Sequence, residues 1–179
     1  MSGVLVAVVG PSGAGKDALI QHAAAQPHHD DVLFVRRLVT RVAGAFEDHG
    51  SISDAAFADG IASGCFALTW RAHGHGYAVP VSALNAVRDG TVAVCNLSRG
   101  AVADAERVFG HVVSVLVTAP AAIITARLAA RGRESPAAIA ARIEREMALT
   151  DFTATHVIVN DGTIAAASAK LIAIVEGLR

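Results

Sequence analysis

Near its N-terminus the chain reads Gly10-Pro11-Ser12-Gly13-Ala14-Gly15-Lys16-Asp17, and this stretch decides the fold. It stands between a β-branched apolar run, 4–9, and a segment of helical composition, 18–25. Every position but the last matches a phosphate-binding loop, in which main-chain N–H groups and a helix N-terminus surround an anion. The lysine adds a mobile positive charge. The order of strand, glycine-rich loop and helix therefore predicts a site for a nucleoside triphosphate.

The last position of the loop differs from the pattern. Asp17 stands where the pattern has Ser or Thr, whose hydroxyl would ligate magnesium. A carboxylate oxygen is also a hard ligand for Mg²⁺, so Asp17 is a candidate metal ligand. The alternative is a glycine-rich turn that only closes a strand–helix unit. That alternative gives no reason for a lysine here, since Lys170 is the only other lysine in the chain.

Composition limits the class of protein. The chain has 179 residues, enough for one domain with a substantial core. Hydrophobic residues make up 53% of it, yet no apolar run reaches the ~20 residues of a membrane span. With no leader-like N-terminus, we expect a cytoplasmic protein without a membrane partner. A net charge of −1 predicts no nucleic-acid partner, and Cys65 and Cys95 are expected to be buried, reduced thiols.

Strands and helices alternate along most of the chain, which predicts an α/β fold: a three-layer αβα P-loop domain around a mainly parallel five-stranded sheet. The expected strands are 4–9, 32–35, 91–95, 112–117 and 157–159. The expected helices are 18–25, 54–62, 81–88, 101–109, 120–130, 136–149 and 165–178. Residues 36–80 do not repeat the strand–helix pattern, so we expect an inserted acceptor-binding subdomain there. Within it, 44–51 is turn-like, 66–71 is a strand and 72–77 is a loop.

Cationic and polar residues gather in two places. The densest cationic cluster in the chain is Arg36-Arg37-Leu38-Val39-Thr40-Arg41. It is either a solvated edge or a site for an anionic substrate, and the second alternative is supported by the bidentate binding of phosphate by arginine. Asn96, Ser98 and Arg99 follow the strand 91–95, at the edge where ligands collect in parallel sheets. His73 and His75 have a spacing that suits a metal, but without a third ligand we expect them to line a pocket.

Taken together, these segments resemble the guanylate kinase-like branch of the P-loop kinases, and within it the ribose 1,5-bisphosphate phosphokinases of phosphonate catabolism. The resemblance covers nearly the whole chain. It rests on the loop 10–17, Val39-Thr40-Arg41, Glu47-Asp48-His49, the segment 68–74, the segment 96–99, Arg131-Gly132-Arg133-Glu134 and Asn160-Asp161-Gly162. It implies ATP-dependent phosphorylation of ribose 1,5-bisphosphate to 5-phosphoribosyl 1-pyrophosphate, with Mg²⁺.

Two departures from guanylate kinases fit an acceptor without a base. Thr69 stands where those enzymes place a glutamate that reads guanine, and Asn96 follows a strand that leads there to an aspartate near the metal. Asp17 would then take over part of the metal-binding role. Two smaller departures, Ala18 and Ala78, stand where the phosphokinases commonly have Thr or Ser and glycine.

The resemblance also implies site residues. Nucleotide contacts fall on Gly10, Pro11, Ser12, Gly13, Ala14, Gly15, Lys16, Asp17 and Ala18, with Asn160 and Asp161 near the adenine, although an Asp-Gly turn alone would also explain that last pair. Catalytic roles fall on Lys16 and on Arg131, Arg133 and Arg142, which would close a lid, about 131–137, over the reacting groups. Acceptor contacts fall on Arg37, Arg41, His49, Trp70, His73, Tyr77, Ser98 and Arg99, and the metal on Asp17.

Three hypotheses follow for the function. The first is phosphoryl transfer from ATP to the sugar bisphosphate. This reaction needs no general base, because the attacking phosphate oxygen is already ionised at neutral pH. A guanylate or other nucleoside monophosphate kinase is the alternative, since Arg37, Arg41 and Tyr77 could hold any phosphorylated acceptor. A guanylate kinase-like interaction module without catalysis is the third, disfavoured because the loop lysine and the lid arginines are present. We expect a monomer or a homodimer.

Overall fold

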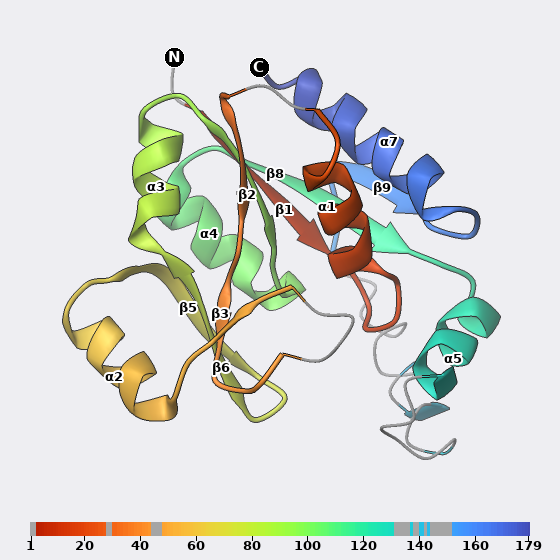
Figure 1. Cartoon of the computed structure of the whole chain (residues 1–179), viewed down its shortest axis with the longest axis horizontal. Helices are drawn as coiled ribbons and strands as arrows, with labels where there is room; N and C mark the ends of the chain where they lie inside the picture. The colour runs from red at the N-terminus through yellow and green to blue at the C-terminus, as the bar shows by residue number, and fades with distance from the viewer. Residues whose placement is uncertain are drawn as a thin grey trace.

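A five-stranded parallel sheet forms the centre of the computed structural model, which describes residues 3–27, 30–43, 48–130, 152–179 and positions 137, 140, 141 and 143 (Figure 1). Its strands, in spatial order, are β2 (Val32–Val35), β7 (Val92–Asn96), β1 (Val4–Val9), β8 (Val112–Thr118) and β9 (His156–Val159). The predicted α/β P-loop fold is therefore confirmed. The strand that leads into the phosphate loop lies in the middle of the sheet.

Helices cover both faces of this sheet (Figure 1). α1 (Lys16–Ala24) and α7 (Ile164–Glu176) lie on one face, and α3 (Val81–Arg88) and α4 (Val102–Phe109) lie on the other. All six residues of β1 are buried, and they alternate between two cores: Val4, Val6 and Val8 face α1 and α7, while Leu5, Ala7 and Val9 face α3 and α4. A strand buried on both faces explains the continuous apolar run in the sequence.

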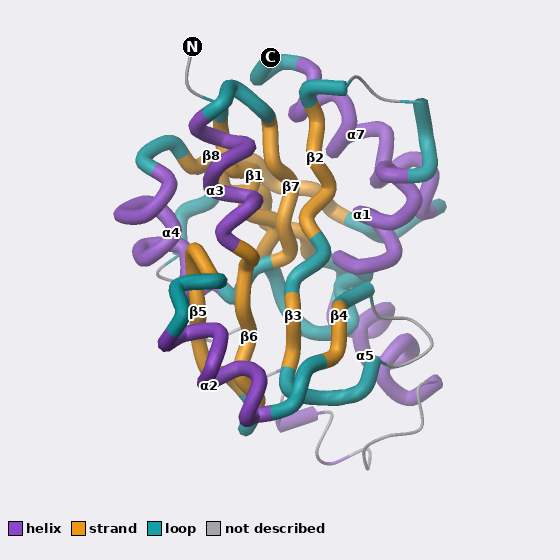
Figure 2. Tube along the Cα trace, turned by 60° about the vertical axis from the view of Figure 1, so that its left-hand side comes forward, coloured by secondary structure: helices purple, strands orange, loops and turns teal. Residues whose placement is uncertain are grey.

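A second sheet of four strands lies beyond one end of the first (Figure 2). Its spatial order is β4 (Gly50–Ser51), β3 (Leu38–Val39), β6 (His75–Pro80) and β5 (Phe66–Ala72). β3 pairs parallel with β4, whereas β6 pairs antiparallel with both β3 and β5. Only Arg36 and Arg37 separate β2 from β3, so these arginines lie at the junction of the two sheets.

The remaining elements connect the sheets. α2 (Asp54–Ala62) packs on β5 and β6, and it begins as predicted, because the Ser53 hydroxyl accepts a hydrogen bond from Ala56 N at 3.1 Å. A single 3₁₀ turn, η1 (Arg99–Ala101), precedes α4, and α5 (Ala121–Ala130) follows β8. Within the part of the chain that the structure describes, no helix is long and apolar enough to cross a bilayer. The predicted helix 136–149 lies largely outside the described residues.

Sequence reasoning placed most core elements within two residues but failed in the second sheet. The predicted loop 72–77 is wrong, since β6 begins at His75, and the predicted turn 44–51 misses β4. A tight turn at His73-Gly74 connects β5 to β6, and both residues have positive φ, 51° and 78°. Such two-residue turns match the twist of a hairpin, so the glycines here allow pairing and do not prevent it.

One cysteine prediction is also wrong. Cys95 is buried, but Cys65 is exposed, at the end of the turn between α2 and β5. Both are free thiols. The apolar neighbours of Cys65 in the sequence therefore gave a false signal of burial.

Candidate active site

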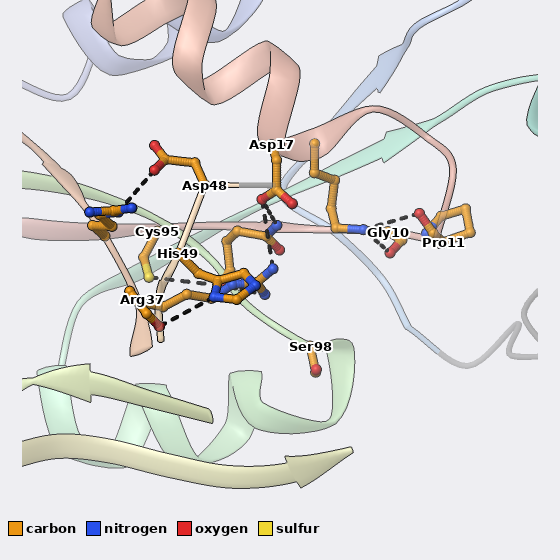
Figure 3. Close-up of polar contacts among 12 residues, drawn as sticks. Gly10, Pro11, Asp17, Arg37, Asp48, His49, Cys95 and Ser98 are labelled. Atoms are coloured by element: carbon orange, nitrogen blue, oxygen red, sulfur yellow. Dashed lines mark hydrogen bonds and ion pairs between the residues drawn. The ribbon is translucent and has the colours of Figure 1, made fainter. Parts of the chain in front are cut away.

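The phosphate loop has the conformation that its sequence predicts. Gly15 has φ 91° and ψ 23°, a left-handed conformation, and α1 begins directly after it at Lys16. A Cβ at Gly15 would lie 2.6 Å from Nδ2 of Asn160, so a side chain is excluded by space as well as by φ. The Lys16 ammonium donates hydrogen bonds to the carbonyl oxygens of Gly10 (2.7 Å) and Pro11 (3.0 Å), which holds it over the loop (Figure 3).

Two side chains from the far end of the chain support the loop. Asn160, just after β9, donates from Nδ2 to the Ala14 carbonyl at 2.8 Å. Arg127, on α5, donates to the same carbonyl at 3.3 Å and to the Asn160 carbonyl at 3.1 Å. Arg127 therefore joins the phosphate loop to the end of β9. Asn160 is buried, with 2% exposure, and lines the cavity described below.

One large cavity, of about 1400 Å³, extends from the phosphate loop to the second sheet. Six cationic side chains line it among the described residues: Lys16, Arg37, Arg41, Arg71, Arg99 and Arg127. Asp17 is the one carboxylate in the described lining. The excess of cations makes the cavity suited to polyanionic ligands, although the chain as a whole carries a formal charge of −1.

The second-sheet end of the cavity is held together by stacked side chains. Trp70 on β5 and Tyr77 on β6 stack with ring centroids 5.2 Å apart and planes 9° apart. Trp70 Nε1 donates to the Ser98 hydroxyl at 2.8 Å, and the Arg37 guanidinium carbon lies 5.5 Å from the Tyr77 ring centroid. These contacts join Ser98, after β7, to the second sheet and to Arg37 at the junction.

Asp17, the last residue of the phosphate loop, extends toward Arg37 (Figure 3). Its Oδ1 accepts a hydrogen bond from Asn96 Nδ2 at 2.5 Å and lies 3.6 Å from Arg37 Nη2. Arg37 Nη1 also donates to the Asn96 main-chain carbonyl at 3.3 Å. Three residues from three elements thus form one polar cluster.

Cys95 lies beside this cluster but is chemically inert. Burial raises the pKa of its thiol to about 12, while the Arg37 guanidinium lowers that pKa and the Asp17 carboxylate raises it. The thiol therefore stays protonated at neutral pH, and a protonated thiol is a poor nucleophile.

Most of the predicted site residues that the structure describes line the cavity. They are Gly10, Ser12, Gly13, Gly15, Lys16, Asp17, Ala18, Arg37, Arg41, Trp70, His73, Tyr77, Ser98, Arg99 and Asn160. Pro11 and Ala14 contribute carbonyls to the loop contacts above but are not in the lining, and Asp161 is exposed beside it. His75 lines the cavity next to His73, as expected for pocket residues.

One acceptor residue has a different place from the one predicted. His49 is fully buried, with 0% exposure, its Nδ1 lies 3.2 Å from the Gly50 carbonyl, and it does not line the cavity. Its neighbour Asp48 pairs with Arg36 at 3.1 Å. The predicted lid residues Arg131, Arg133 and Arg142 lie outside the described residues.

Sequence reasoning missed three cavity residues of note. Arg127 stands four positions before Arg131, one helical turn away, and that spacing was the available signal. Asn96 was placed at the strand edge where ligands collect, and where guanylate kinases lead to an aspartate, but it was given no role in the site. Arg71 lies in the segment 68–74, yet its guanidinium carbon sits 5.5 Å from the Phe57 ring centroid, a contact that no local pattern reports.

The chemistry of the donor set fits Mg²⁺. Among the described residues no group of three His, Cys, Asp or Glu side chains could hold a metal ion. Mg²⁺ does not require such a cage, since it keeps several waters and commonly binds through one or two carboxylates and substrate phosphates. Asp17 supplies a carboxylate in the first turn of α1, and the buried Asn96 Oδ1 has no hydrogen-bond partner among the described residues.

Curated relatives match along almost the whole chain. The chain is 48% identical to ribose 1,5-bisphosphate phosphokinase PhnN of Methylobacterium radiotolerans over 174 residues, 97% of each chain. It is 42% identical to the protein of the same name from Bradyrhizobium diazoefficiens over 175 residues, 97% of this chain and 88% of that one. No family model matches the chain.

A solved structure confirms the fold. Guanylate kinase from Anaplasma phagocytophilum superposes with a TM-score of 0.69 over 98% of this chain and 86% of that one, at 19% sequence identity. At that identity the likeness establishes the architecture and nothing more. The identity and coverage of the curated relatives go further: this chain belongs to the ribose 1,5-bisphosphate phosphokinase family.

Proposed function

We propose that this protein transfers the γ-phosphoryl group of ATP to ribose 1,5-bisphosphate, giving 5-phosphoribosyl 1-pyrophosphate and ADP. The names of its relatives supply the acceptor. One observation on this chain carries the proposal: the described lining of a single cavity holds six cationic side chains and one carboxylate, with the phosphate loop at one side. Such a lining suits two polyphosphorylated ligands bound together and offers no carboxylate, apart from Asp17, to read a base.

The donor half of the cavity is assigned to ATP. Main-chain N–H groups of Ser12 to Lys16 would bind the β- and γ-phosphates, as expected where a glycine-rich loop meets a helix N-terminus. Lys16 would turn from the carbonyls of Gly10 and Pro11 toward the phosphates, since both contacts are hydrogen bonds that a phosphate can replace. Arg127, anchored on two carbonyls beside the loop, adds a fixed positive charge.

The acceptor half is assigned to the sugar bisphosphate. Arg37, Arg41 and Tyr77 would hold one phosphate, and Ser98 and Arg99 the other. Arg37 lies over the Tyr77 ring and Ser98 accepts from Trp70 Nε1, so the Trp70–Tyr77 stack links the two groups and would set the spacing between the phosphates. His73 and Trp70 line the same end and would contact the sugar. His49 is buried and does not line the cavity, and its Nδ1 lies 3.2 Å from the Gly50 carbonyl oxygen.

The reaction needs positioning more than acid–base chemistry. An oxygen of the acceptor 1-phosphate forms a bond to the γ-phosphorus while the bond to the β,γ-bridging oxygen breaks, and ADP leaves with that electron pair. The attacking oxygen is already ionised, so no proton has to be removed. Cations placed around the transferring group stabilise its charge, and removing one such contact typically costs ~10²-fold or more in rate.

Mg²⁺ would be held by Asp17 together with substrate phosphates, and when bound it would neutralise charge on the β- and γ-phosphates. Arg131 and Arg133 are assigned to a lid, about 131–137, that would close over the transferring group together with Arg142 of the following predicted helix. Asp161 is assigned to the neighbourhood of the adenine. Residues 36–80 would be the acceptor-binding insertion in a single domain with core 1–35 and 81–179. We further expect a cytoplasmic monomer or homodimer that acts in phosphonate degradation.

A coupled assay of ADP release tests this proposal. The purified protein is given ATP, Mg²⁺ and, in separate reactions, ribose 1,5-bisphosphate, GMP, AMP or gluconate, and the sugar product is identified by mass. Turnover of ribose 1,5-bisphosphate with formation of 5-phosphoribosyl 1-pyrophosphate is expected. Preferential turnover of GMP would instead support a guanylate kinase, and no turnover of any acceptor would favour a non-catalytic module.

A further inference from the structure

The cluster of Asp17, Arg37 and Asn96 joins the two halves of the cavity. Asp17 belongs to the first turn of α1, Arg37 to the junction between β2 and β3, and Asn96 to the end of β7. Asn96 contacts both partners, with its side-chain amide on the Asp17 carboxylate and its main-chain carbonyl on Arg37. Asn96 is 5% exposed, so these contacts are shielded from water.

Two buried polar atoms of the cluster are not satisfied by hydrogen bonds within it. Arg37 Nε and Asn96 Oδ1 are buried and have no hydrogen-bond partner within the described part of the chain. A buried polar group left without a partner costs about 1–3 kcal/mol, so both atoms favour a state in which a bound molecule supplies the partner. Both residues line the cavity, where a phosphate oxygen would satisfy the donor and a water or a metal ion the acceptor.

Asp17 balances the charge of Arg37. Arg37 Nη2 lies 3.6 Å from Asp17 Oδ1, and the two side chains are only 11% and 18% exposed. An ion pair shielded in this way is screened less than one at the surface. A cation that approaches the Asp17 carboxylate would weaken its hold on Arg37, and the guanidinium would then be available to a phosphate at the acceptor end.

We propose that Asn96 is a positioning residue and that, through Asp17 and Arg37, it makes the binding of the two substrates cooperative. Nucleotide bound with Mg²⁺ at Asp17 releases Arg37 toward the acceptor phosphate, and a bound acceptor phosphate in turn leaves Asp17 free for the nucleotide side. Asn96 holds the Asp17 carboxylate and the Arg37 guanidinium in fixed relative positions, so that displacement of one group shifts the other. The identity of the acceptor and the binding of nucleotide with Mg²⁺ at Asp17 rest on the proposed function, whereas the contacts among Asp17, Arg37 and Asn96 do not.

Trp70 provides a reporter for this coupling. It is the only tryptophan in the chain, and it stacks on Tyr77, which lies beneath Arg37. Movement of Arg37 relative to Tyr77 should change the emission of Trp70. Adding Mg²⁺ with adenylyl imidodiphosphate, an ATP analogue whose γ-phosphoryl group is not transferred, should therefore change Trp70 emission even without an acceptor.

The decisive measurement is the dissociation constant of ribose 1,5-bisphosphate, followed by Trp70 emission, with and without Mg²⁺ and the ATP analogue. We expect the analogue to tighten acceptor binding about fivefold or more in the wild-type protein, within the usual range for coupled sites. In Asn96→Ala that ratio should approach one, and the response of Trp70 to nucleotide alone should be lost. Asn85→Ala, on the exposed side of α3, is the matched control and should behave as wild type.

Asp17→Asn separates coupling from a general structural role. It removes the charge that balances Arg37 and keeps the shape of the side chain, so acceptor binding without nucleotide should become tighter than in the wild type. A structural defect would weaken it. Unchanged or weaker binding in Asp17→Asn, or a wild-type ratio in a folded Asn96→Ala protein, would overturn the inference. Thermal unfolding of each variant establishes that it is folded.

These measurements distinguish failure of the coupling from failure of the proposed function. If ribose 1,5-bisphosphate neither binds nor reacts with the wild-type protein, the proposed acceptor is wrong. The Trp70 response to Mg²⁺ and the ATP analogue still tests the coupling, because that titration contains no acceptor. A response that is equal in wild type and in folded Asn96→Ala overturns the coupling whatever the acceptor is.

Discussion

The two halves of the cavity are built in opposite ways. The donor half is centred on one continuous segment, the loop 10–17, whose glycines and junction with α1 set its conformation, while Arg127 and Asn160 support it from outside the loop. The acceptor half is assembled from short strands that are far apart in the sequence: β3 has two residues and pairs with both β4 and β6. The first half is determined locally and the second by long-range pairing.

This difference has a chemical side. The donor half presents mainly main-chain N–H groups and one lysine, and these groups suit any nucleoside triphosphate. The acceptor half presents side chains from several elements, among them Arg37, Arg41, Tyr77, Ser98 and Arg99. Substrate choice should therefore be set by the second sheet, and loss of the loop should stop the reaction whatever the acceptor is.

The largest effect is expected for Lys16→Ala. Loss of the loop cation should lower kcat ~10²-fold or more, the scale for a single electrostatic contact in a transition state. Steady-state ADP release at saturating acceptor measures it. Lys170→Ala, on the exposed surface of α7, removes the other lysine of the chain and should leave kcat unchanged. Equal rates for wild type and Lys16→Ala would show that the loop does not hold the reacting phosphates.

Gly15→Ala should break the donor half through its backbone. A left-handed conformation costs a non-glycine residue about 1–2 kcal/mol, and the new methyl group would also meet Asn160 Nδ2 at 2.6 Å. Chemical denaturation measures the loss of stability, and a calorimetric titration measures ATP binding. Gly64→Ala is the matched control, because φ is 69° and no atom lies within 4 Å of the new Cβ. If both variants lose equal stability and bind ATP equally, the contact with Asn160 has no role.

Arg41→Ala should damage the acceptor half alone. Loss of one guanidinium from a phosphate site should raise the acceptor KM about tenfold, because a charge-assisted hydrogen bond contributes roughly 1.5–3 kcal/mol. The KM for ATP should change less than about twofold, because Arg41 is assigned to the acceptor phosphate and not to the nucleotide. Arg36→Ala serves as a nearby control, since Arg36 pairs with Asp48 and does not line the cavity. A defect in ATP binding alone would place Arg41 on the donor side.

The smallest effect is expected for Ser98→Ala. It removes the oxygen that accepts the Trp70 Nε1 hydrogen bond at 2.8 Å, and losing such a bond costs about 1 kcal/mol. The free energy of unfolding and the emission maximum of Trp70 should both change. Ser82→Ala, at an exposed position on α3, should alter neither quantity. An unshifted Trp70 spectrum in Ser98→Ala would show that this bond does not order the acceptor end.

The same contrast explains what the sequence could predict. The loop, the buried strands and helices such as 54–62 and 81–88 follow from local patterns, and the structure confirms them. β3 and β4 are too short to show any periodicity, and His75-Gly76 looked like a loop although it continues a hairpin. The sequence places Asn96 at the end of a strand but does not predict its role. That role depends on contacts with Asp17 and Arg37, which are distant in the chain.

The place of β1 in the sheet has a consequence for how the molecule folds. Val4 pairs with Val92 and Leu5 pairs with Val112, so both neighbours of β1 are synthesised long after it. Contacts between residues so far apart form slowly, because a long chain must close before they contribute. On the ribosome, β1 would wait for β7 and β8 before it has neighbours to pair with. The ability to bind nucleotide should therefore be acquired late, and ATP added during refolding should stabilise the final state without speeding the early steps.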